Sequence, residues 1–133
     1  MAKKDKATIL IVDDKPANLI ALETLLETPD RILINANNGK DALKITLNRD
    51  IDLIILDVQM PDMDGLEATS AIREQERGTK KHLPIIAMTA HAMSGDRERC
   101  LEAGMDAYVT KPVDAKKLLA AIADAAIRPE LGL

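Results

Sequence analysis

Acidic residues follow two apolar segments of this sequence, at the points where strands would end. Asp57 closes the run Leu53–Leu56, and Asp13 and Asp14 close Thr8–Val12. Three carboxylates in one place would repel one another and raise one another's pKa, and a bound divalent cation relieves that repulsion. Mg²⁺ suits such a site best, because it prefers oxygen ligands and is commonly held by one or two carboxylates with a phosphate. Mn²⁺ is a second candidate ion.

A carboxylate beside a bound cation is suited to accepting a phosphoryl group. Asp57 would attack phosphorus as the nucleophile. The ammonium of Lys111 would neutralise charge on the transferring oxygens, and the hydroxyl of Thr89 would donate a hydrogen bond to one of them. A cis bond between Lys111 and Pro112 would direct the lysine into the pocket.

Each of these residues also has an ordinary structural explanation. A lone aspartate at a strand end is usually a turn former or a helix cap. Thr89 could cap the segment after it, Lys111 could be a solvated surface lysine, and Tyr108, the sole aromatic residue, could simply fill the core. A functional role is favoured over these structural explanations, because polar groups from four separate strand ends would converge on one edge of a sheet.

The elements that would position these groups alternate between strands and helices. Uninterrupted or alternating apolar runs predict strands, and apolar residues at helical spacing predict the helices between them. The predicted strands are Thr8–Val12, Arg31–Ala36, Leu53–Leu56, Pro84–Met88 and Asp106–Val109. Right-handed crossovers then give a doubly wound α/β sandwich. We expect Arg73–Lys81 to form a solvated loop, and His82 and His91 to be exposed.

Composition narrows the classes of function. The chain has 133 residues, which predicts one domain at 8–128, a flexible basic arm at 1–7 and a tail at 129–133. A net charge of -4 argues against direct nucleic-acid binding. No apolar run approaches the roughly 18 residues of a membrane span. The single Cys100 fits a reducing compartment, so we expect a cytoplasmic protein.

Several segments together resemble the signature set of two-component response-regulator receiver domains. They are Ile11–Asp14, Leu56–Gly65, Met88–Ala90 and Lys111–Pro112. The likeness extends from about Thr8 to Ile127, with every motif in order. It implies a flavodoxin-like (βα)5 fold whose five-stranded parallel sheet has the order 2-1-3-4-5, in agreement with the doubly wound arrangement expected above.

The resemblance also implies a role for each residue at the acidic edge. Asp57 would be the phosphoacceptor, and Asp14 would bind Mg²⁺ directly. Asp13 would act partly through water, and the backbone carbonyl of Gln59 would be a further ligand. The donor would be a histidine kinase or a histidine phosphotransfer protein.

The resemblance further implies a conformational switch. Lys111 would contact the phosphoryl group, and Thr89 and Tyr108 would form the switch pair. Their movement would alter the face made by the fourth helix, fifth strand and last helix. The chain would catalyse only its own phosphorylation and dephosphorylation. Two alternatives are a pseudo-receiver that never accepts phosphate and, less favoured, an aspartyl phosphatase, which would need a further acid or base near Asp57.

The two halves of the sequence resemble different relatives within the family. Met88–Met93 and Gly104–Tyr108 resemble receivers attached to hybrid sensor kinases, whereas Asp13–Leu19 resembles receivers that precede other signalling modules. A stand-alone phosphorelay receiver, a piece of a larger protein and an assembled sequence therefore remain alternatives. A homodimer could form through the first helix or through the switching face.

Overall fold

Strands and helices alternate along the chain as the sequence predicts. The computed structural model describes residues 7–60, 63–79, 81–90, 95–111 and 113–126. The strands are β1 (Ala7–Val12), β2 (Arg31–Ala36), β3 (Leu53–Asp57), β4 (Ile85–Thr89) and β5 (Ala107–Thr110). The helices are α1 (Pro16–Leu26), α2 (Gly39–Asn48), α3 (Gly65–Glu76), α4 (Asp96–Ala103) and α5 (Ala115–Ala126).

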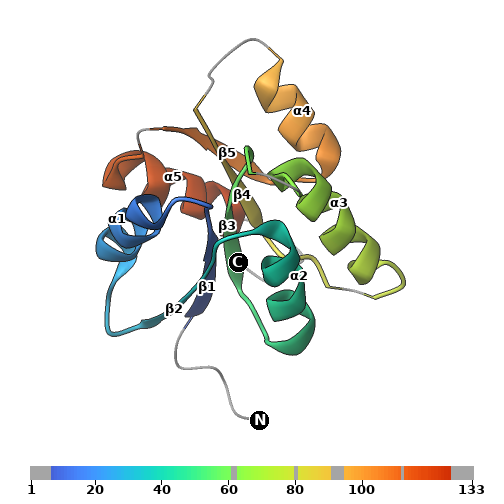
Figure 1. Cartoon of the computed structure of the whole chain (residues 1–133), viewed down its shortest axis with the longest axis horizontal. Helices are drawn as coiled ribbons and strands as arrows, with labels where there is room; N and C mark the ends of the chain where they lie inside the picture. The colour runs from blue at the N-terminus through green and yellow to red at the C-terminus, as the bar shows by residue number, and fades with distance from the viewer. Residues whose placement is uncertain (1–6, 61–62, 80, 91–94, 112, 127–133) are drawn as a thin grey trace.

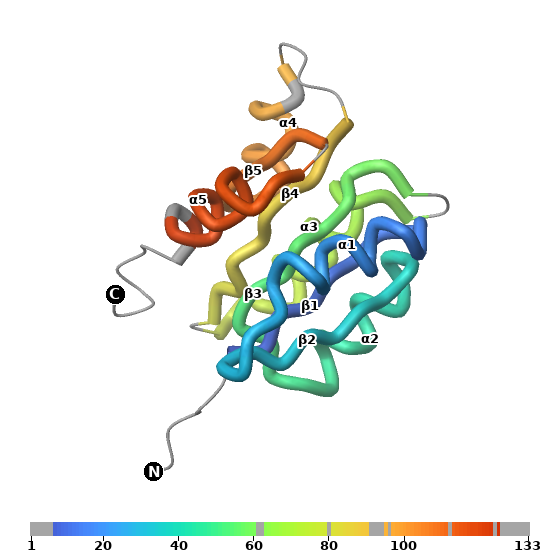
Figure 2. Tube along the Cα trace, turned by 90° about the vertical axis from the view of Figure 1, so that its left-hand side faces the viewer, coloured from blue at the N-terminus to red at the C-terminus, as the bar shows by residue number. Residues whose placement is uncertain are grey.

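The five strands form one parallel sheet in the order β2-β1-β3-β4-β5 (Figure 2). Helices α1 and α5 cover one face of this sheet, and α2, α3 and α4 cover the other (Figure 1). The doubly wound architecture and the strand order predicted from the sequence are therefore confirmed. The predicted arm and tail, 1–7 and 129–133, lie outside the described residues except for Ala7, which begins β1.

The central strand β3 shows why its sequence lacks polar alternation. Leu53 and Ile55 belong to the apolar cluster beneath α1 and α5. Ile54 and Leu56 belong to the cluster beneath α2, α3 and α4. Because both faces of the strand are covered, every position must be apolar until Asp57, where the strand reaches the edge of the sheet.

The segment Arg73–Lys81, expected to be a solvated loop, is different in the structure. Helix α3 continues to Glu76, and the guanidinium of Arg73 is mostly buried, with 19% of its side chain exposed. It donates to the carbonyl of Gly104 at 2.7 and 2.9 Å and pairs with Asp106 at 2.9 Å. The loop prediction is therefore wrong for Arg73–Glu76, because a run of charged residues does not reveal that one of them faces inward, whereas residues 77–79 form the exposed turn that was expected.

His82, expected to be exposed, is instead partly buried. Its Nε2 lies 2.7 Å from Oδ1 of Asp106, and 26% of its side chain is exposed. The same carboxylate accepts the backbone N–H of Ile85 at 2.8 Å. Asp106 thus connects the loop before β4 with the loop before β5. His91 lies outside the described residues.

Gly65 begins α3 directly against the end of β3. A Cβ atom at this position would lie 2.5 Å from the carbonyl oxygen of Asp57 and 2.8 Å from Cα of Val58. We therefore expect Gly65→Ala to lower the free energy of unfolding by about 1–3 kcal/mol, because backbone must shift to admit the methyl group. Urea unfolding followed by circular dichroism measures this. Ser70→Ala on the exposed side of α3 should change stability by less than about 0.5 kcal/mol, and an equally small effect at Gly65 would contradict the expectation.

Candidate functional site

Three carboxylates meet at the carboxyl edge of the sheet. Asp57 is the last residue of β3 and is 3% exposed, and Asp13 directly follows β1 and is fully buried. Asp14, the next residue, is half-buried. One oxygen from each of the three lies within 4.8 Å of the others. The structure therefore brings together the acidic residues that the sequence places at two strand ends.

Asp13 is held by three donors. The backbone N–H of Lys15 donates to its Oδ1 at 2.9 Å. The side-chain amide of Asn18 donates to its Oδ2 at 3.1 Å, and the ammonium of Lys111 reaches the same oxygen at 3.2 Å. A buried carboxylate needs such partners, and two of them come from the N-cap residue and the first turn of α1. The start of α1 thus fixes the orientation of Asp13.

Lys111 bridges two of the carboxylates. Its Nζ lies 3.2 Å from Oδ1 of Asp57 and 3.2 Å from Oδ2 of Asp13. The backbone N–H of Lys111 donates to the carbonyl of Thr89 at 2.8 Å, which holds the end of β5 against β4. The backbone N–H of Gln59 also donates to Oδ1 of Asp57, at 3.3 Å. Lys111 is therefore already within reach of any group that joins Asp57.

The pKa of Asp57 is raised from its usual value to about 6, chiefly by burial and secondly by the nearby carboxylate of Asp13, with Lys111 opposing both. Burial alone would lower the pKa of Lys111, but the carboxylates of Asp57 and Asp13 outweigh it and leave that pKa raised. At neutral pH Asp57 is thus ionised, but at a cost in free energy because its charge is buried. Protonation would remove its ability to act as a nucleophile as the pH falls below about 6.

The donor set fits a hard divalent cation. All three converging side chains, Asp13, Asp14 and Asp57, offer carboxylate oxygens, and no nitrogen or sulfur ligand joins them among the described residues. Oxygen-only sites favour Mg²⁺ or Mn²⁺ over zinc or copper. The backbone N–H of Gln59 donates to Asp57, and the carbonyl of Gln59 as a metal ligand stays a prediction.

A pocket of about 400 Å³ opens over these groups. Its lining comprises Lys15, Asn18, Asp57, Gln59, Ala90 and Lys111. Lys15 and Asn18 were not singled out from the sequence. The signal that could have found them is Pro16, since a helix that starts there turns residues 15 and 18 toward the preceding acidic pair.

The proposed switch residues lie on the two strands beyond Asp57, β4 and β5. Thr89 ends β4 and is buried, and its neighbour Ala90 lines the pocket over Asp57. Tyr108 is partly buried in β5, opposite Ala87 of β4. It lines a separate groove of about 380 Å³ with residues of α4 and α5. The pair thus spans β4 and β5, while Pro112, with its predicted cis bond, lies outside the described residues.

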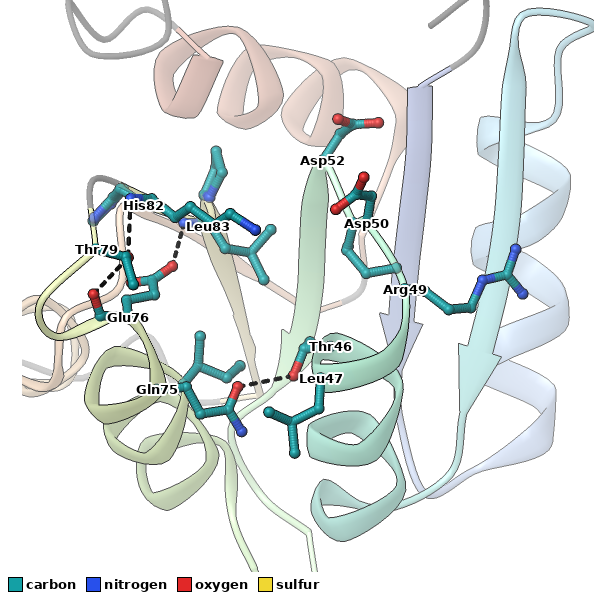
Figure 3. Close-up of a pocket in the computed structure, with 14 residues that line it drawn as sticks. Thr46, Leu47, Arg49, Asp50, Asp52, Gln75, Glu76, Thr79, His82 and Leu83 are labelled. Atoms are coloured by element: carbon teal, nitrogen blue, oxygen red, sulfur yellow. Dashed lines mark hydrogen bonds between the residues drawn. The ribbon is translucent and has the colours of Figure 1, made fainter.

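A larger pocket, of about 480 Å³, lies at the opposite edge of the sheet (Figure 3). It is enclosed by the carboxyl ends of α2 and α3 and by the loops that lead into β3 and β4. Thr46 and Gln75 join its two helices through a 3.4 Å hydrogen bond. Its described lining holds none of the residues singled out for chemistry, so the smaller acidic pocket is the better candidate.

The fold and this site together define a small doubly wound α/β domain. A cluster of carboxylates that suits a divalent cation lies at the carboxyl edge of its sheet. The family model of the response regulator receiver domain matches residues 9–123. The chain therefore belongs to the response regulator receiver domain family of two-component signal transduction.

Known relatives and solved structures agree with this assignment. The chain is 40% identical to sensor histidine kinase GacS of Pseudomonas protegens, over 94% of this chain but only 15% of the kinase. The receiver domain of sensor histidine kinase PA1611 from Pseudomonas aeruginosa, solved with magnesium in its active-site cleft, is 37% identical with a TM-score of 0.76, covering 86% of this chain and 93% of that domain.

A third relative is chemotaxis protein CheY4 of Vibrio cholerae. Its structure is 27% identical with a TM-score of 0.81, covering 90% of this chain and 98% of that protein. Within the described part of this chain, none of the helices has the length and apolar character needed to cross a bilayer.

Proposed function

We propose that this receiver domain accepts a phosphoryl group on Asp57 from a phosphohistidine of a histidine kinase or histidine phosphotransfer protein. The observation that carries the proposal is the position of Asp57. Its buried carboxylate faces a pocket, beside two further carboxylates and within 3.2 Å of the Lys111 ammonium. The similarity to sensor histidine kinases supports a histidine-bearing partner.

The transfer forms one bond and breaks another. A carboxylate oxygen of Asp57 donates an electron pair to phosphorus while the bond from phosphorus to the imidazole nitrogen breaks, and that nitrogen keeps the bonding electrons. The ammonium of Lys111, which is hydrogen-bonded to Asp57, would donate to the phosphoryl oxygens and stabilise their negative charge during the transfer. Asp57 itself is shielded from bulk water, with 3% of the residue exposed.

Asp13, Asp14 and Asp57 would hold Mg²⁺, with Mn²⁺ as an alternative ion. When bound, the ion supplies positive charge against the phosphoryl oxygens. The magnesium in the PA1611 receiver domain supports this part of the proposal. The carboxylates of this chain would then be relieved of the repulsion that raises the pKa of Asp57.

The phosphorylated state would be transmitted through β4 and β5. Thr89 would move toward the phosphoryl group, and Tyr108 would reorient beside the groove between α4 and α5. The altered α4-β5-α5 face would be the output, and the chain would catalyse only its own phosphorylation and dephosphorylation. A cytoplasmic location belongs to the same proposal.

Intact mass after incubation with Mg²⁺ and acetyl phosphate tests the proposal. We expect a gain of one phosphoryl group that is absent when EDTA replaces Mg²⁺. A phosphohistidine-bearing phosphotransfer protein serves as a second donor. If neither donor adds mass to a protein that still binds Mg²⁺, the proposal is overturned in favour of a pseudo-receiver.

Mg²⁺ is expected to stabilise the fold, because the native state gathers carboxylates that the unfolded chain separates. At a concentration of 100 times the dissociation constant the gain is about 2.7 kcal/mol. The gain should shrink below pH 6, since Asp57, with a pKa of about 6, becomes protonated there and loses its charge. Thermal unfolding by calorimetry at pH 8 and pH 5 measures the stabilisation by Mg²⁺ and its decrease at low pH, with NaCl at matched ionic strength as control. An unchanged melting temperature at pH 8 would count against the metal site.

A further inference from the structure

Lys15 stands at the mouth of the acidic pocket with its backbone fixed in place. It lines the same pocket as Asp57 and Lys111 and is exposed. Its N–H donates to Asp13 at 2.9 Å, and its carbonyl accepts the N–H of Asn18 at 3.0 Å. Pro16 follows it as the first residue of α1 and restricts the backbone further. The side chain is therefore tethered beside the pocket even though its ammonium is solvated.

The positive charge of Lys15 is not neutralised by a salt bridge to a described residue. Lys111 is shared between Asp13 and Asp57, whereas the Lys15 ammonium forms no salt bridge with any residue that the structure describes. With a divalent cation bound, the charges of the three carboxylates, the cation and Lys111 would sum to zero. Lys15 then gives the mouth of the pocket a net positive charge.

We propose that Lys15 is a specificity-determining residue that favours phosphodonors whose whole molecule is a dianion. The proposal rests on the function proposed for Asp57. A charge at the rim of a site acts mainly by raising the association rate of an oppositely charged ligand, and salt weakens this effect. Lys15 attracts the dianion to the pocket, and Lys111 and the carboxylate site complete the reaction below it.

This role has a signature that damage to the structure would not produce. The positive charge that attracts a dianion also opposes a divalent cation at the neighbouring carboxylates. Lys15→Glu should therefore slow phosphorylation by acetyl phosphate and, at the same time, strengthen Mg²⁺ binding. A variant with a distorted site would instead lose both.

The experiment compares Lys15→Glu, Lys15→Gln and Lys15→Arg in the whole chain. Lys81→Glu is the matched control, because Lys81 is also exposed but lines the pocket at the opposite edge of the sheet. Initial rates of mass gain are measured at pH 7 with acetyl phosphate, which is a dianion, and with phosphoramidate, whose ammonium group makes it a monoanion overall. Isothermal titration calorimetry measures the Mg²⁺ dissociation constant.

For Lys15→Glu we expect a rate with acetyl phosphate about 3–10-fold lower at 10 mM ionic strength and less than about twofold lower at 0.5 M. The loss with phosphoramidate should be smaller. Mg²⁺ should bind about 2–5-fold more tightly at low salt. Lys15→Gln should lie between Lys15→Glu and wild type, while Lys15→Arg and Lys81→Glu should behave as wild type.

Three results would overturn the proposal alone: a rate loss that salt does not reduce, weaker Mg²⁺ binding in Lys15→Glu, or an equal effect of Lys81→Glu. A wild-type chain that gains no phosphoryl group from acetyl phosphate, phosphoramidate or the phosphohistidine-bearing phosphotransfer protein would overturn the proposed function together with it. Wild-type phosphorylation thus separates failure of the donor-selecting role from failure of Asp57 as the acceptor.

Discussion

Asp57→Asn is expected to abolish phosphoryl acceptance while leaving the fold intact. The amide nitrogen and oxygen occupy nearly the same volume as the carboxylate, so the end of β3 keeps its packing. The neutral amide is a poor nucleophile toward phosphorus and offers less charge to a divalent cation. We therefore expect no detectable labelled phosphate on the variant, with the circular dichroism spectrum of the wild type.

The measurement uses a phosphohistidine donor carrying a radiolabelled phosphoryl group. Asp64→Asn is the matched control, because it makes the same chemical change in an aspartate that caps α3, and asparagine caps helices as well as aspartate does. That control should accept phosphate at the wild-type rate. Label retained by Asp57→Asn would show that another residue is the acceptor.

Asp57→Asn also tests how much the buried charge of Asp57 lowers the free energy of unfolding. The pKa of Asp57 is raised from 3.8 to about 6 by burial and by Asp13. The native state therefore binds the proton more tightly than the unfolded chain, and the stability of the metal-free wild type should fall as the pH rises from about 4 to about 6 and then level off. At pH 8 the metal-free Asp57→Asn variant should be more stable by about 1–3 kcal/mol. Urea unfolding at pH 4 and pH 8, in EDTA, measures the difference, and equal pH dependence of the two proteins would contradict it.

The sequence was sufficient to predict the fold and the position of the acidic cluster. The reason is geometric: parallel strands end at one edge of the sheet, so any polar residue that terminates an apolar run lies there. Asp13 and Asp57 follow this rule directly, as β1 and β3 are neighbours. The strand order could be predicted because the chain resembles a family whose topology is known.

In segments rich in polar and charged residues, the sequence could not predict which side chains face the interior or a pocket. Arg73 lies in a charged run, yet it packs against Gly104 and Asp106, which are about 30 residues away in sequence. Lys15 and Asn18 line the pocket only because α1 begins at Pro16 and turns its first residues toward Asp57. Such positions depend on how separate elements meet in space, which local spacing does not encode.

Lys111→Ala is expected to destabilise the metal-free protein, because it removes the cation between two buried carboxylates. The free energy of unfolding should fall by about 1–3 kcal/mol, less than for a fully buried pair since 22% of the lysine side chain is exposed. Saturating Mg²⁺ should restore most of this loss, because a divalent cation relieves the same repulsion. Urea unfolding with and without Mg²⁺ measures both effects, and Lys116→Ala on the exposed surface of α5 should show neither.

The same substitution should separate phosphorylation from its readout. Lys111 joins Asp57 to β4 through its backbone bond to Thr89, so without its ammonium a phosphoryl group on Asp57 loses its link to the β4-β5 pair. Tyr108 is the sole aromatic residue, and its ring signals in a proton NMR spectrum therefore report on β5 without overlap from other tyrosines or phenylalanines. We expect these signals to shift when the wild type is phosphorylated and to stay in place in phosphorylated Lys111→Ala. A wild-type shift in the variant would mean that the phosphoryl group reaches Tyr108 without Lys111.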